Sequence, residues 1–347
     1  MSDLQLKVDG KIYSGWKSIR IQRGMRRFSD TFDLSLTEKW TGQNQSRPIK
    51  EDSPCKVEID GEPVIVGFVD DVNVDYDSGS HEVSVVGRSQ LSDLIDCSQS
   101  SKTFKNETLE QIAIKICNIF NINVIVECDV GEAFNSKILS PGETYCEFLQ
   151  GLASYRAVHL TSNAAGHFVI ARASKQRINT ALILGENILS GSGTRSKRGR
   201  YHKYMVYGQQ PGNDHNNGTS SAHVYGEATD KNIREVRTKS MPADDLNPRD
   251  AQRLAENERN IAYGESQIKK YTVNGWKHDD GLWEPNKLVA VKDAYQEIDE
   301  DLLITHVTFI MDEDGQRTEL ELMPPEGMDL IPLPEKESDE SWLLKQS

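Results

Sequence analysis

Short runs of alternating apolar and polar residues, separated by glycine-containing turns, constrain this chain most. Residues 4–8 alternate before Asp9-Gly10, and residues 57–59 alternate before Asp60-Gly61. Successive side chains of a strand point to opposite faces, so such runs predict half-buried strands. Asp-Gly supplies the positive φ angles that tight hairpin turns need. With little helix between its strands, the segment 1–98 is predicted to form an antiparallel β-barrel domain.

The segment 99–176 has a different pattern. Apolar residues at helical spacing follow Thr108, which with Gln111 is a candidate capping box, and a second helix is expected to begin near Thr144 with Glu147 as its box partner. A strand over 122–128 and a hairpin around residues 163–166 complete the pattern. The segment is therefore predicted to be a small α+β domain with helices on one face of a short sheet.

The segment 177–330 returns to strands and predicts a second β-barrel domain. It contains one inserted helix, 247–266, with Asn247 as the N-cap and Pro248 at the first helical position, where a missing N–H costs nothing. Residues 331–347 lose periodicity, become acidic and form a C-terminal tail. The predicted fold class is α+β, mainly β: two antiparallel β-barrel domains flanking a small α+β domain.

Two cationic clusters stand out in a chain with a net charge of -14 from 40 basic and 54 acidic residues. One lies at the loop 24–31 and the other in a glycine-rich stretch, 190–200. Each has two interpretations, a contact with an acidic partner or an ordinary solvated loop. The candidate interface residues are Arg23, Arg26 and Arg27 in the first cluster, and Arg195, Lys197, Arg198 and Arg200 in the second.

The acidic balance weighs against a dedicated nucleic-acid binder, because affinity for nucleic acid comes from neutralising phosphates. It suits a surface past which nucleic acid can slide, since like charges repel. The sequence has no apolar run of about 18 residues, so no transmembrane helix is expected. Its N-terminus lacks the basic and apolar regions of a signal peptide, so the chain is expected to stay in the cytoplasm where it is made.

Motifs for enzymes, cofactors and metals are missing from the sequence. It has no nucleophile elbow, zinc-protease motif, P-loop or dinucleotide fingerprint. Its five cysteines form no C-x-x-C pair and are expected to be reduced and inert. We therefore predict no catalytic residue, no cofactor and no metal. Four of the tryptophans are either plugs at barrel ends or a carbohydrate platform; these are Trp16, Trp40, Trp276 and Trp283.

Several segments, taken in their order and spacing, resemble the baseplate hub proteins of contractile-tailed phages. The likeness extends to the Mu-like tail proteins and the wider late control protein D group, and it covers nearly the whole chain. The segments that carry it are FSDTFDLSLT (28–37), VEIDGEPVIVGFVDDV (57–72), VSVVGRSQLSDLID (83–96), GENILSGSGTRSKRGRYHKYMVYGQ (185–209), EATDKNIREVR (227–237) and VNGWKHDDGLWEPNKLVAVKD (273–293).

The resemblance implies a structural protein of the virion that is assembled in the host cytoplasm. Such hubs are homotrimers in which each chain supplies two tube-like β-barrel domains, so that three chains form a ring of six similar units. This ring joins a sixfold tail tube to a threefold central spike, and DNA passes through its lumen without specific binding. The α+β domain lies outside the ring, toward the spike. The predicted partners are thus further copies of the chain, the tail tube protein and the spike protein.

An alternative function is a glycan-binding or hydrolase module directed at the cell wall, because some phage hubs carry fused hydrolases. The two β domains and the insert use up the chain, which leaves no room for a lysozyme-sized domain. For the C-terminal tail, one interpretation is disorder. The other is that the apolar patch Trp342, Leu343 and Leu344 docks on the spike.

Overall fold

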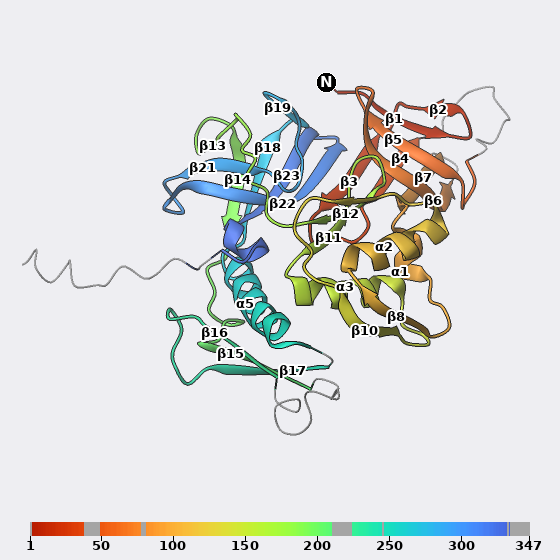
Figure 1. The fold of residues 1–347 in the computed structure, drawn as a ribbon. Coiled ribbons are helices and arrows are strands. Elements are labelled where there is room, and N and C mark those ends of the chain that lie inside the picture. Colours follow the sequence, from red (N-terminus) through yellow and green to blue (C-terminus); the bar gives the residue numbers. More distant parts are fainter. Residues whose placement is uncertain are drawn as a thin grey trace, which may run out of the picture. The chain divides into compact units, whose positions relative to one another are not determined.

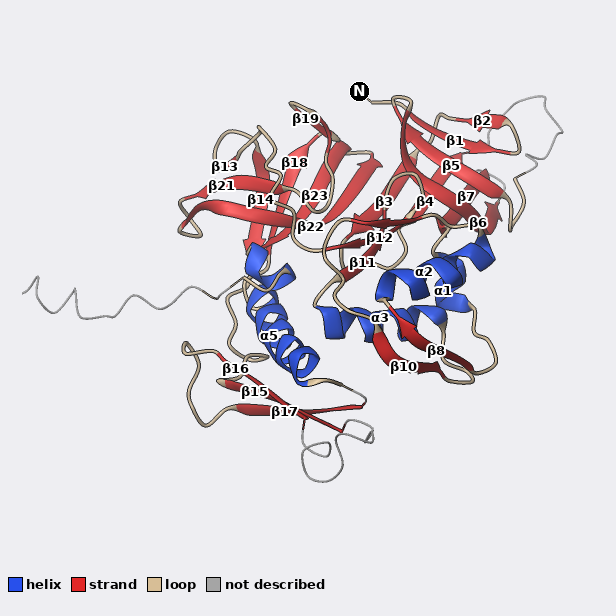
Figure 2. Cartoon of the chain, in the orientation of Figure 1, coloured by secondary structure: helices blue, strands red, loops and turns tan. Residues whose placement is uncertain are grey.

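One large, mostly antiparallel sheet dominates the fold (Figures 1 and 2). Its strands follow the order β14-β18-β23-β22-β3-β4-β7-β6-β5-β1-β2, and β21, paired with β13, joins it beside β22. The computed structural model describes residues 2–37, 49–77, 81–209, 224–244, 246–331 and 333. A mainly β fold with a smaller helical part confirms the predicted class.

The strands of this sheet come from both ends of the chain. From the first part come β1 (Leu4–Val8), β2 (Lys11–Tyr13), β3 (Ser18–Gly24), β4 (Thr31–Thr37), β5 (Pro54–Ile59), β6 (Glu62–Tyr76) and β7 (His81–Ser89). From the last part come β13 (Leu182–Ile183), β14 (Ile188–Gly193), β18 (Lys269–Asn274), β21 (Leu288–Asp293), β22 (Ile298–Asp312) and β23 (Gly315–Met323). The pairing of β3 with β22 joins the two sets.

The two sets contain matching three-stranded meanders. β5, β6 and β7 have 6, 15 and 9 residues, and so do β21, β22 and β23. Each long strand carries a register shift near its middle, between Val69 and Asp71 in β6 and between Ile304 and His306 in β22. The neighbouring strands in the sheet match as well. Beyond β7 lie β4 and then β3, and beyond β23 lie β18 and then β14. The five strands β3, β4, β7, β6 and β5 are therefore arranged like β14, β18, β23, β22 and β21.

Alternation along the strands places the apolar core on one face of this sheet. In β3, Ile19 and Ile21 are buried while Arg20 between them is exposed, and the Asp9-Gly10 and Asp60-Gly61 turns adopt the positive φ angles that the sequence predicted. Burial of apolar area at about 25 cal/mol per Å² is the main stabilising contribution. The largest side chains of this core include Trp276, Phe32, Phe309 and Tyr271.

The α+β segment contains the predicted helices and two small sheets. It follows the short helix α1 (Ser92–Asp96), and its elements are β8 (Lys102–Glu107), α2 (Leu109–Cys117), η1 (Asn118–Phe120), β9 (Val124–Val126), β10 (Phe134–Leu139), α3 (Tyr145–Arg156), β11 (His159–Ser162) and β12 (Phe168–Ala171). The Thr108–Gln111 capping box forms as predicted, and Thr144 and Glu147 exchange the same two hydrogen bonds before α3. β8 pairs with β10, while β9, β12 and β11 form the second sheet.

The chain separates into two units. Unit 1 comprises residues 1–153, 158–193 and 268–323, and unit 2 comprises residues 154–157, 194–267 and 324–347. Unit 2 contains the mixed sheet β16-β15-β17 and the long helix α5, which packs on β15 and β16. The bounds are β15 (Lys203–Gln209), β16 (Val224–Thr229), β17 (Thr238–Asp244), α5 (Pro248–Glu265) and η2 (Pro325–Met328).

Helix α5 begins as the sequence predicted. The Asn247 side chain accepts a hydrogen bond from the backbone N–H of Asp250, and Pro248 occupies the first turn. The division into units cuts across the predicted boundaries, because unit 2 takes most of its residues from the segment predicted as the second β-barrel domain. Two short strands, β19 (Lys277–His278) and β20 (Gly281–Leu282), form a separate hairpin in unit 1. No described helix is both long and apolar enough to cross a membrane.

Candidate partner-binding surface

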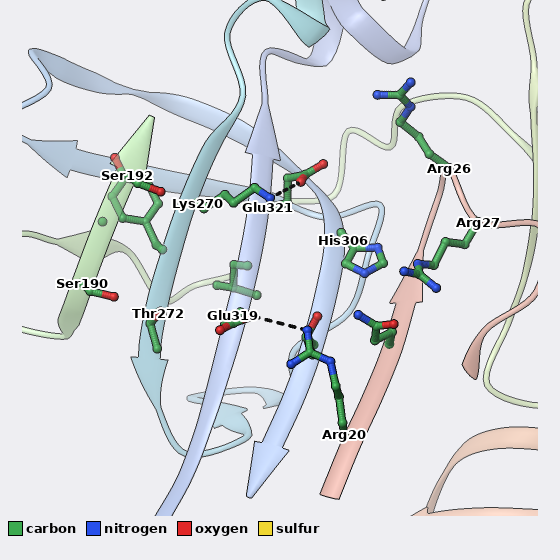
Figure 3. Close-up of a pocket in the computed structure, with 15 residues that line it drawn as sticks. Arg20, Arg26, Arg27, Ser190, Ser192, Lys270, Thr272, His306, Glu319 and Glu321 are labelled. Atoms are coloured by element: carbon green, nitrogen blue, oxygen red, sulfur yellow. Dashed lines mark ion pairs between the residues drawn. The ribbon is translucent and has the colours of Figure 1, made fainter. Parts of the chain in front are cut away.

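A groove with a volume of about 770 Å³ lies on the polar face of the large sheet in unit 1 (Figure 3). Its floor is formed by β14, β18, β23, β22 and β3, and Arg26 and Arg27 from the β3–β4 loop lie at its edge. Arg26 and Arg27 belong to the cationic cluster that the sequence singled out. The groove is therefore the candidate site in which to test the role of that cluster.

Strand register assembles the groove from residues that are far apart in sequence. Cross-strand partners stand side by side on one face of a sheet, so each row of partners forms a line of side chains. One row runs Ser192, Lys270, Glu321, His306 and Gly24; the next runs Ser190, Thr272, Glu319, Thr308 and Gln22. Residues between these rows, such as Tyr271, Leu320 and Val307, are buried in the core.

The groove carries more positive than negative side chains. The Lys270 ammonium lies 3.3 Å from the Glu321 carboxylate, and the Arg20 guanidinium lies 4.0 Å from that of Glu319. Both pairs are partly exposed, so each contributes at most about 1 kcal/mol and is readily exchanged for another partner. Arg27 adds a further cation beside His306 (Figure 3). The surface is thus suited to an acidic partner.

His306 is a neutral side chain among these cations. Burial lowers the pKa of its imidazole to about 4, and Arg27, Lys270 and Arg20 add to the effect because they repel a second positive charge. Its cross-strand partner is Gly24, where a Cβ atom would lie 2.3 Å from His306 Nδ1. Glycine at this position leaves the space that the imidazole ring occupies.

The β3–β4 loop is anchored to the α+β segment. Met25 and Phe28 are buried, and the Phe28 ring makes an edge contact with Phe168, the centroids being 5.7 Å apart. The Asp30 carboxylate accepts hydrogen bonds from Ser162 Oγ at 2.9 Å, from the Gly24 N–H at 3.3 Å, and from Arg23 Nε at 3.4 Å. Burial raises the pKa of Asp30, and the nearby Arg23 guanidinium opposes that shift.

The three arginines of the first cluster therefore have different surroundings. Arg23 is buried against Asp30, whereas Arg26 and Arg27 line the groove. The interpretation of the loop as a simple solvated corner is wrong, because most of its residues are packed. The inclusion of Arg23 in a surface cluster is also wrong. Its burial had a signal in the sequence, since Ile19, Ile21 and Arg23 share one face of the strand.

The second cluster divides in the same way. In unit 2, Arg200 is buried and donates to the Asp230 carboxylate from Nη2 at 2.6 Å and from Nε at 2.9 Å. Its guanidinium also lies over the Tyr263 ring, 5.0 Å from the centroid. Arg195, Lys197 and Arg198 are exposed. The exposed three remain candidates for a partner contact, while Arg200 has a structural role within unit 2.

Sequence reasoning missed several residues of the groove. Arg20, Lys270, His306, Glu319 and Glu321 each occupy the polar position of an alternating strand, which predicts solvent exposure and nothing more. The alternation itself was the available signal, because it identifies the residues that share a face. It does not identify which strands are neighbours.

The structure also locates the tryptophans and cysteines that the sequence analysis considered. Trp16, Trp276 and Trp283 are buried in the main core, so these three do not form a carbohydrate platform, and Trp40 lies outside the described residues. The patch Trp342, Leu343 and Leu344 also lies outside them. None of the five cysteines, all of which lie in the described ranges, forms a disulfide. Within the described ranges, no three His, Cys, Asp or Glu side chains converge to hold a metal ion.

Comparison with protein families identifies the class to which this chain belongs, the phage baseplate proteins. Residues 3–89 match the N-terminal domain described as Mu phage baseplate assembly protein GpP-like, and residues 92–172 match the second domain of the baseplate hub protein gp44-like family. Residues 247–331 match the fourth domain of the Mu phage baseplate assembly protein GpP.

Individual relatives make the assignment specific. The chain is 33% identical over 342 residues to the baseplate hub protein gp44 of Escherichia phage Mu, which covers 94% of this chain and 89% of the relative. The crystal structure of the prophage MuSo2 43 kDa tail protein from Shewanella oneidensis is 36% identical and has a TM-score of 0.84, with 95% of this chain and 100% of that chain covered. The tail protein from Neisseria meningitidis MC58 shares the fold, with a TM-score of 0.82 at 24% identity and coverages of 95% and 98%.

This chain belongs to the family of Mu baseplate hub proteins. It is a baseplate hub protein of a Mu-like phage tail, and its relatives are structural proteins of the virion tail.

Proposed function

We propose that this chain is the non-enzymatic hub of a contractile tail, in which three copies form a ring that joins the tail tube to the central spike. Each chain supplies two tube-like β modules, one within residues 1–98 and one within residues 177–330. Three chains then present six similar units, so that a sixfold tube and a threefold spike can both be matched. The segment 99–176 lies outside the ring, toward the spike.

The observation that supports this proposal best is the matching of the meanders β5-β6-β7 and β21-β22-β23, with equal strand lengths and register shifts at nearly the same place. Two similar modules in one chain are what a threefold assembly needs in order to approximate sixfold symmetry. DNA passes through the lumen without specific binding, which is consistent with a net charge of -14.

Mass in solution and the shape of the particle test the ring. Sedimentation velocity should give a stable species of three times 39.0 kDa, and electron micrographs of it should show a central opening. A particle that stays monomeric at micromolar concentration, or a trimer without an opening, contradicts the proposal. Clearing of peptidoglycan or retention on a polysaccharide resin supports the alternative, a cell-wall-directed module.

The groove supports a more specific role in docking. Its cations Arg20, Arg27 and Lys270 lie on one polar face, where they suit an acidic surface of the tail tube protein. Replacing all three by Glu should abolish binding to the tube protein and leave the trimer intact. A matched control replaces the exposed Lys11, Lys17 and Lys50 by Glu, which changes the net charge equally. If both triple variants bind the tube protein equally well, the groove is not the docking surface.

Two further contacts complete the proposal. Arg195, Lys197 and Arg198 meet an acidic partner surface, and Trp342, Leu343 and Leu344 dock on the spike. Truncation at Pro334, followed by a pull-down with the spike protein, tests the tail. Unchanged recovery of the spike protein would remove the tail from the interface.

A further inference from the structure

Unit 2 gathers basic residues in two neighbouring loops. The loops 195–200 and 230–237 contain seven basic residues against two acidic ones, Asp230 and Glu235. Arg200 and Asp230 are buried as an ion pair, which leaves six basic residues at least partly exposed. These six form the basic patch: Arg195, Lys197, Arg198, Lys231, Arg234 and Arg237.

Hydrogen bonds hold the two loops of the basic patch together. Arg237 Nη1 donates to the carbonyl of Lys197 at 2.5 Å, and Arg237 Nη2 donates to the carbonyl of Arg198. Lys197 Nζ donates to the carbonyl of Asn232 at 3.4 Å. Carbonyl groups carry no net charge, so these bonds position the cations without neutralising them. In the part of the chain that the structure describes, neither Arg198 nor Arg234 is paired with a carboxylate.

The end of helix α5 holds the first of these loops. The Ser196 N–H donates to the carbonyl of Ser266, the residue that caps the helix, at 3.0 Å. The Arg200 guanidinium lies over the Tyr263 ring within the last turn of the helix. The basic patch therefore begins beside the C-terminal end of α5.

The C-terminal segment leaves the same part of this helix. Asn260 Nδ2 donates to the carbonyls of Asp329 at 2.7 Å and Ile331 at 2.8 Å. Asn260 and Tyr263 are three positions apart, so their Cβ atoms are neighbours on the helix surface, about 5–6 Å from each other. The chain beyond Ile331 thus starts next to the residue on which Arg200 lies.

The sequence that follows is acidic, and it lies outside the described residues. Glu335, Glu337 and Asp339 alternate with other residues, and Glu340 is a fourth acid beside the single Lys336. In an extended segment alternate side chains share one side, so three carboxylates would form a row with a spacing of about 7 Å. The four residues after the exit point at 331 span up to about 13 Å when extended. The acidic segment is therefore within reach of the basic patch.

We propose that the acidic segment 335–340 of each chain lies on the basic patch of its own unit 2. This inference rests on the part of the proposed function that gives the second cationic cluster an acidic partner, and it names that partner. Single exposed ion pairs are weak. Here a short tether keeps the two surfaces at an effective concentration in the millimolar range, so several weak pairs suffice. The apolar patch 342–344, directly beyond the acidic segment, is then presented from a fixed place on unit 2.

Zero-length cross-linking tests the contact in the intact chain. A carbodiimide joins a lysine ammonium to a carboxylate only where the two groups touch. Lys197 should couple to Glu335, and mass spectrometry of the digested protein identifies this product, the tail link. About 1 M salt should lower the yield of the tail link several-fold, because the Debye length falls to about 3 Å. An equal yield at high salt would contradict a contact made by charge.

Reversal of charge in the basic patch should break the contact. Arg198→Glu combined with Arg234→Glu should lower the yield of the tail link about tenfold, because attraction becomes repulsion. The matched control, Lys17→Glu with Lys50→Glu, changes the net charge equally on exposed residues of unit 1 and should leave the yield unchanged. Equal loss in both double variants would refute the assignment to the basic patch.

Exchange of charge between patch and tail should restore the contact. When Glu337→Lys and Asp339→Lys are added to the patch double variant, opposite charges face each other again, and most of the tail link should return. The two residues that form the link are unchanged in every variant. A yield that stays at the level of the patch double variant would overturn the proposal.

Isotope labelling identifies the chain to which the bound segment belongs. In an equal mixture of ¹⁵N-labelled and unlabelled protein, a contact within one chain gives linked peptides that are wholly labelled or wholly unlabelled. Linked peptides with one labelled and one unlabelled half would show that the segment of another copy occupies the patch, contrary to the proposal.

The same variants separate failure of this inference from failure of the proposed function. If no tail link forms, yet the patch double variant binds the tube or spike protein less tightly, the inference is wrong and the proposed partner contact stands. If no tail link forms and the double variant binds both proteins normally, the second cationic cluster has no acidic partner and both fail.

Discussion

Gly24 and His306 face each other across the seam between β3 and β22, and a Cβ atom on Gly24 would lie 2.3 Å from His306 Nδ1. The same atom would lie 2.9 Å from the carbonyl oxygen of Thr305, a backbone group that has little freedom to move. The close approach therefore favours glycine at position 24, within the strand pairing that joins the two halves of the sheet.

Gly24→Ala should lower the free energy of unfolding by about 1–3 kcal/mol, because the added methyl group forces the seam apart. Urea denaturation followed by circular dichroism measures the change. Gly151→Ala is the control, since no atom lies within 4 Å of its Cβ position and helix α3 gains from alanine. A loss of stability no greater for Gly24→Ala than for the control would contradict this account of the seam.

The pKa of His306 predicts a pH dependence with a definite sign. Its pKa in the folded protein, about 4, is below the ordinary 6.5. Between pH 4 and pH 6.5 the unfolded chain therefore binds a proton at this residue that the native protein does not bind. The stability that comes from neutral His306 is fully present above pH 6.5 and is lost as the pH falls toward 4. Within that window the slope is at most about 1.4 kcal/mol per pH unit.

His306→Gln should remove this part of the pH dependence. The measurement is the difference in unfolding free energy between the two proteins at pH 7, 6 and 5. An NMR titration of the imidazole provides an independent check, and a midpoint near 6.5 in the native protein would refute the prediction.

Arg23 and Asp30 should behave as a coupled buried pair. Asp30→Leu alone leaves the Arg23 guanidinium buried without a counter-charge and should cost about 3–5 kcal/mol of stability. Arg23→Met alone should be similarly costly, and the double variant should lose less than the sum of the two. A double-mutant cycle by urea denaturation measures the coupling. Strict additivity would mean that the pair does not interact.

Gly226→Ala should loosen α5 from β16. A Cβ atom at this position would lie 2.3 Å from the carbonyl carbon and oxygen of Ala251 in the helix backbone. Hydrogen exchange should show faster opening of α5 in unit 2 and unchanged protection of the large sheet in unit 1. Gly199→Ala, where nothing lies within 4 Å of the Cβ position, should change neither. Protection of α5 equal to that of the unmodified protein would contradict the predicted clash.

Local features of the fold followed from the sequence because short-range interactions determine them. The Asp9-Gly10 and Asp60-Gly61 turns and the cap at Asn247 formed where the residue types predicted. Each depends only on neighbours within a few positions, through a positive φ angle or an orphan N–H group.

Long-range pairing did not follow from the sequence. Ser192, Lys270 and His306 share one row of the groove only because β14, β18, β23 and β22 are neighbours in a register that no local pattern specifies. The ion pair of Arg200 with Asp230 likewise depends on tertiary folding. The sequence therefore could not distinguish a buried Arg200 from a solvated one. The charge of a side chain alone does not predict that it is exposed, because an arginine can be buried beside a carboxylate that is distant in sequence.

The seam between β3 and β22 lies within a single polypeptide, so dilution of the protein does not weaken it. Because the two strands are tethered, their association is unimolecular and does not weaken when the protein concentration falls. Any contact between separate copies obeys mass action instead. If copies of this chain separate, each protomer therefore keeps its internal seam intact.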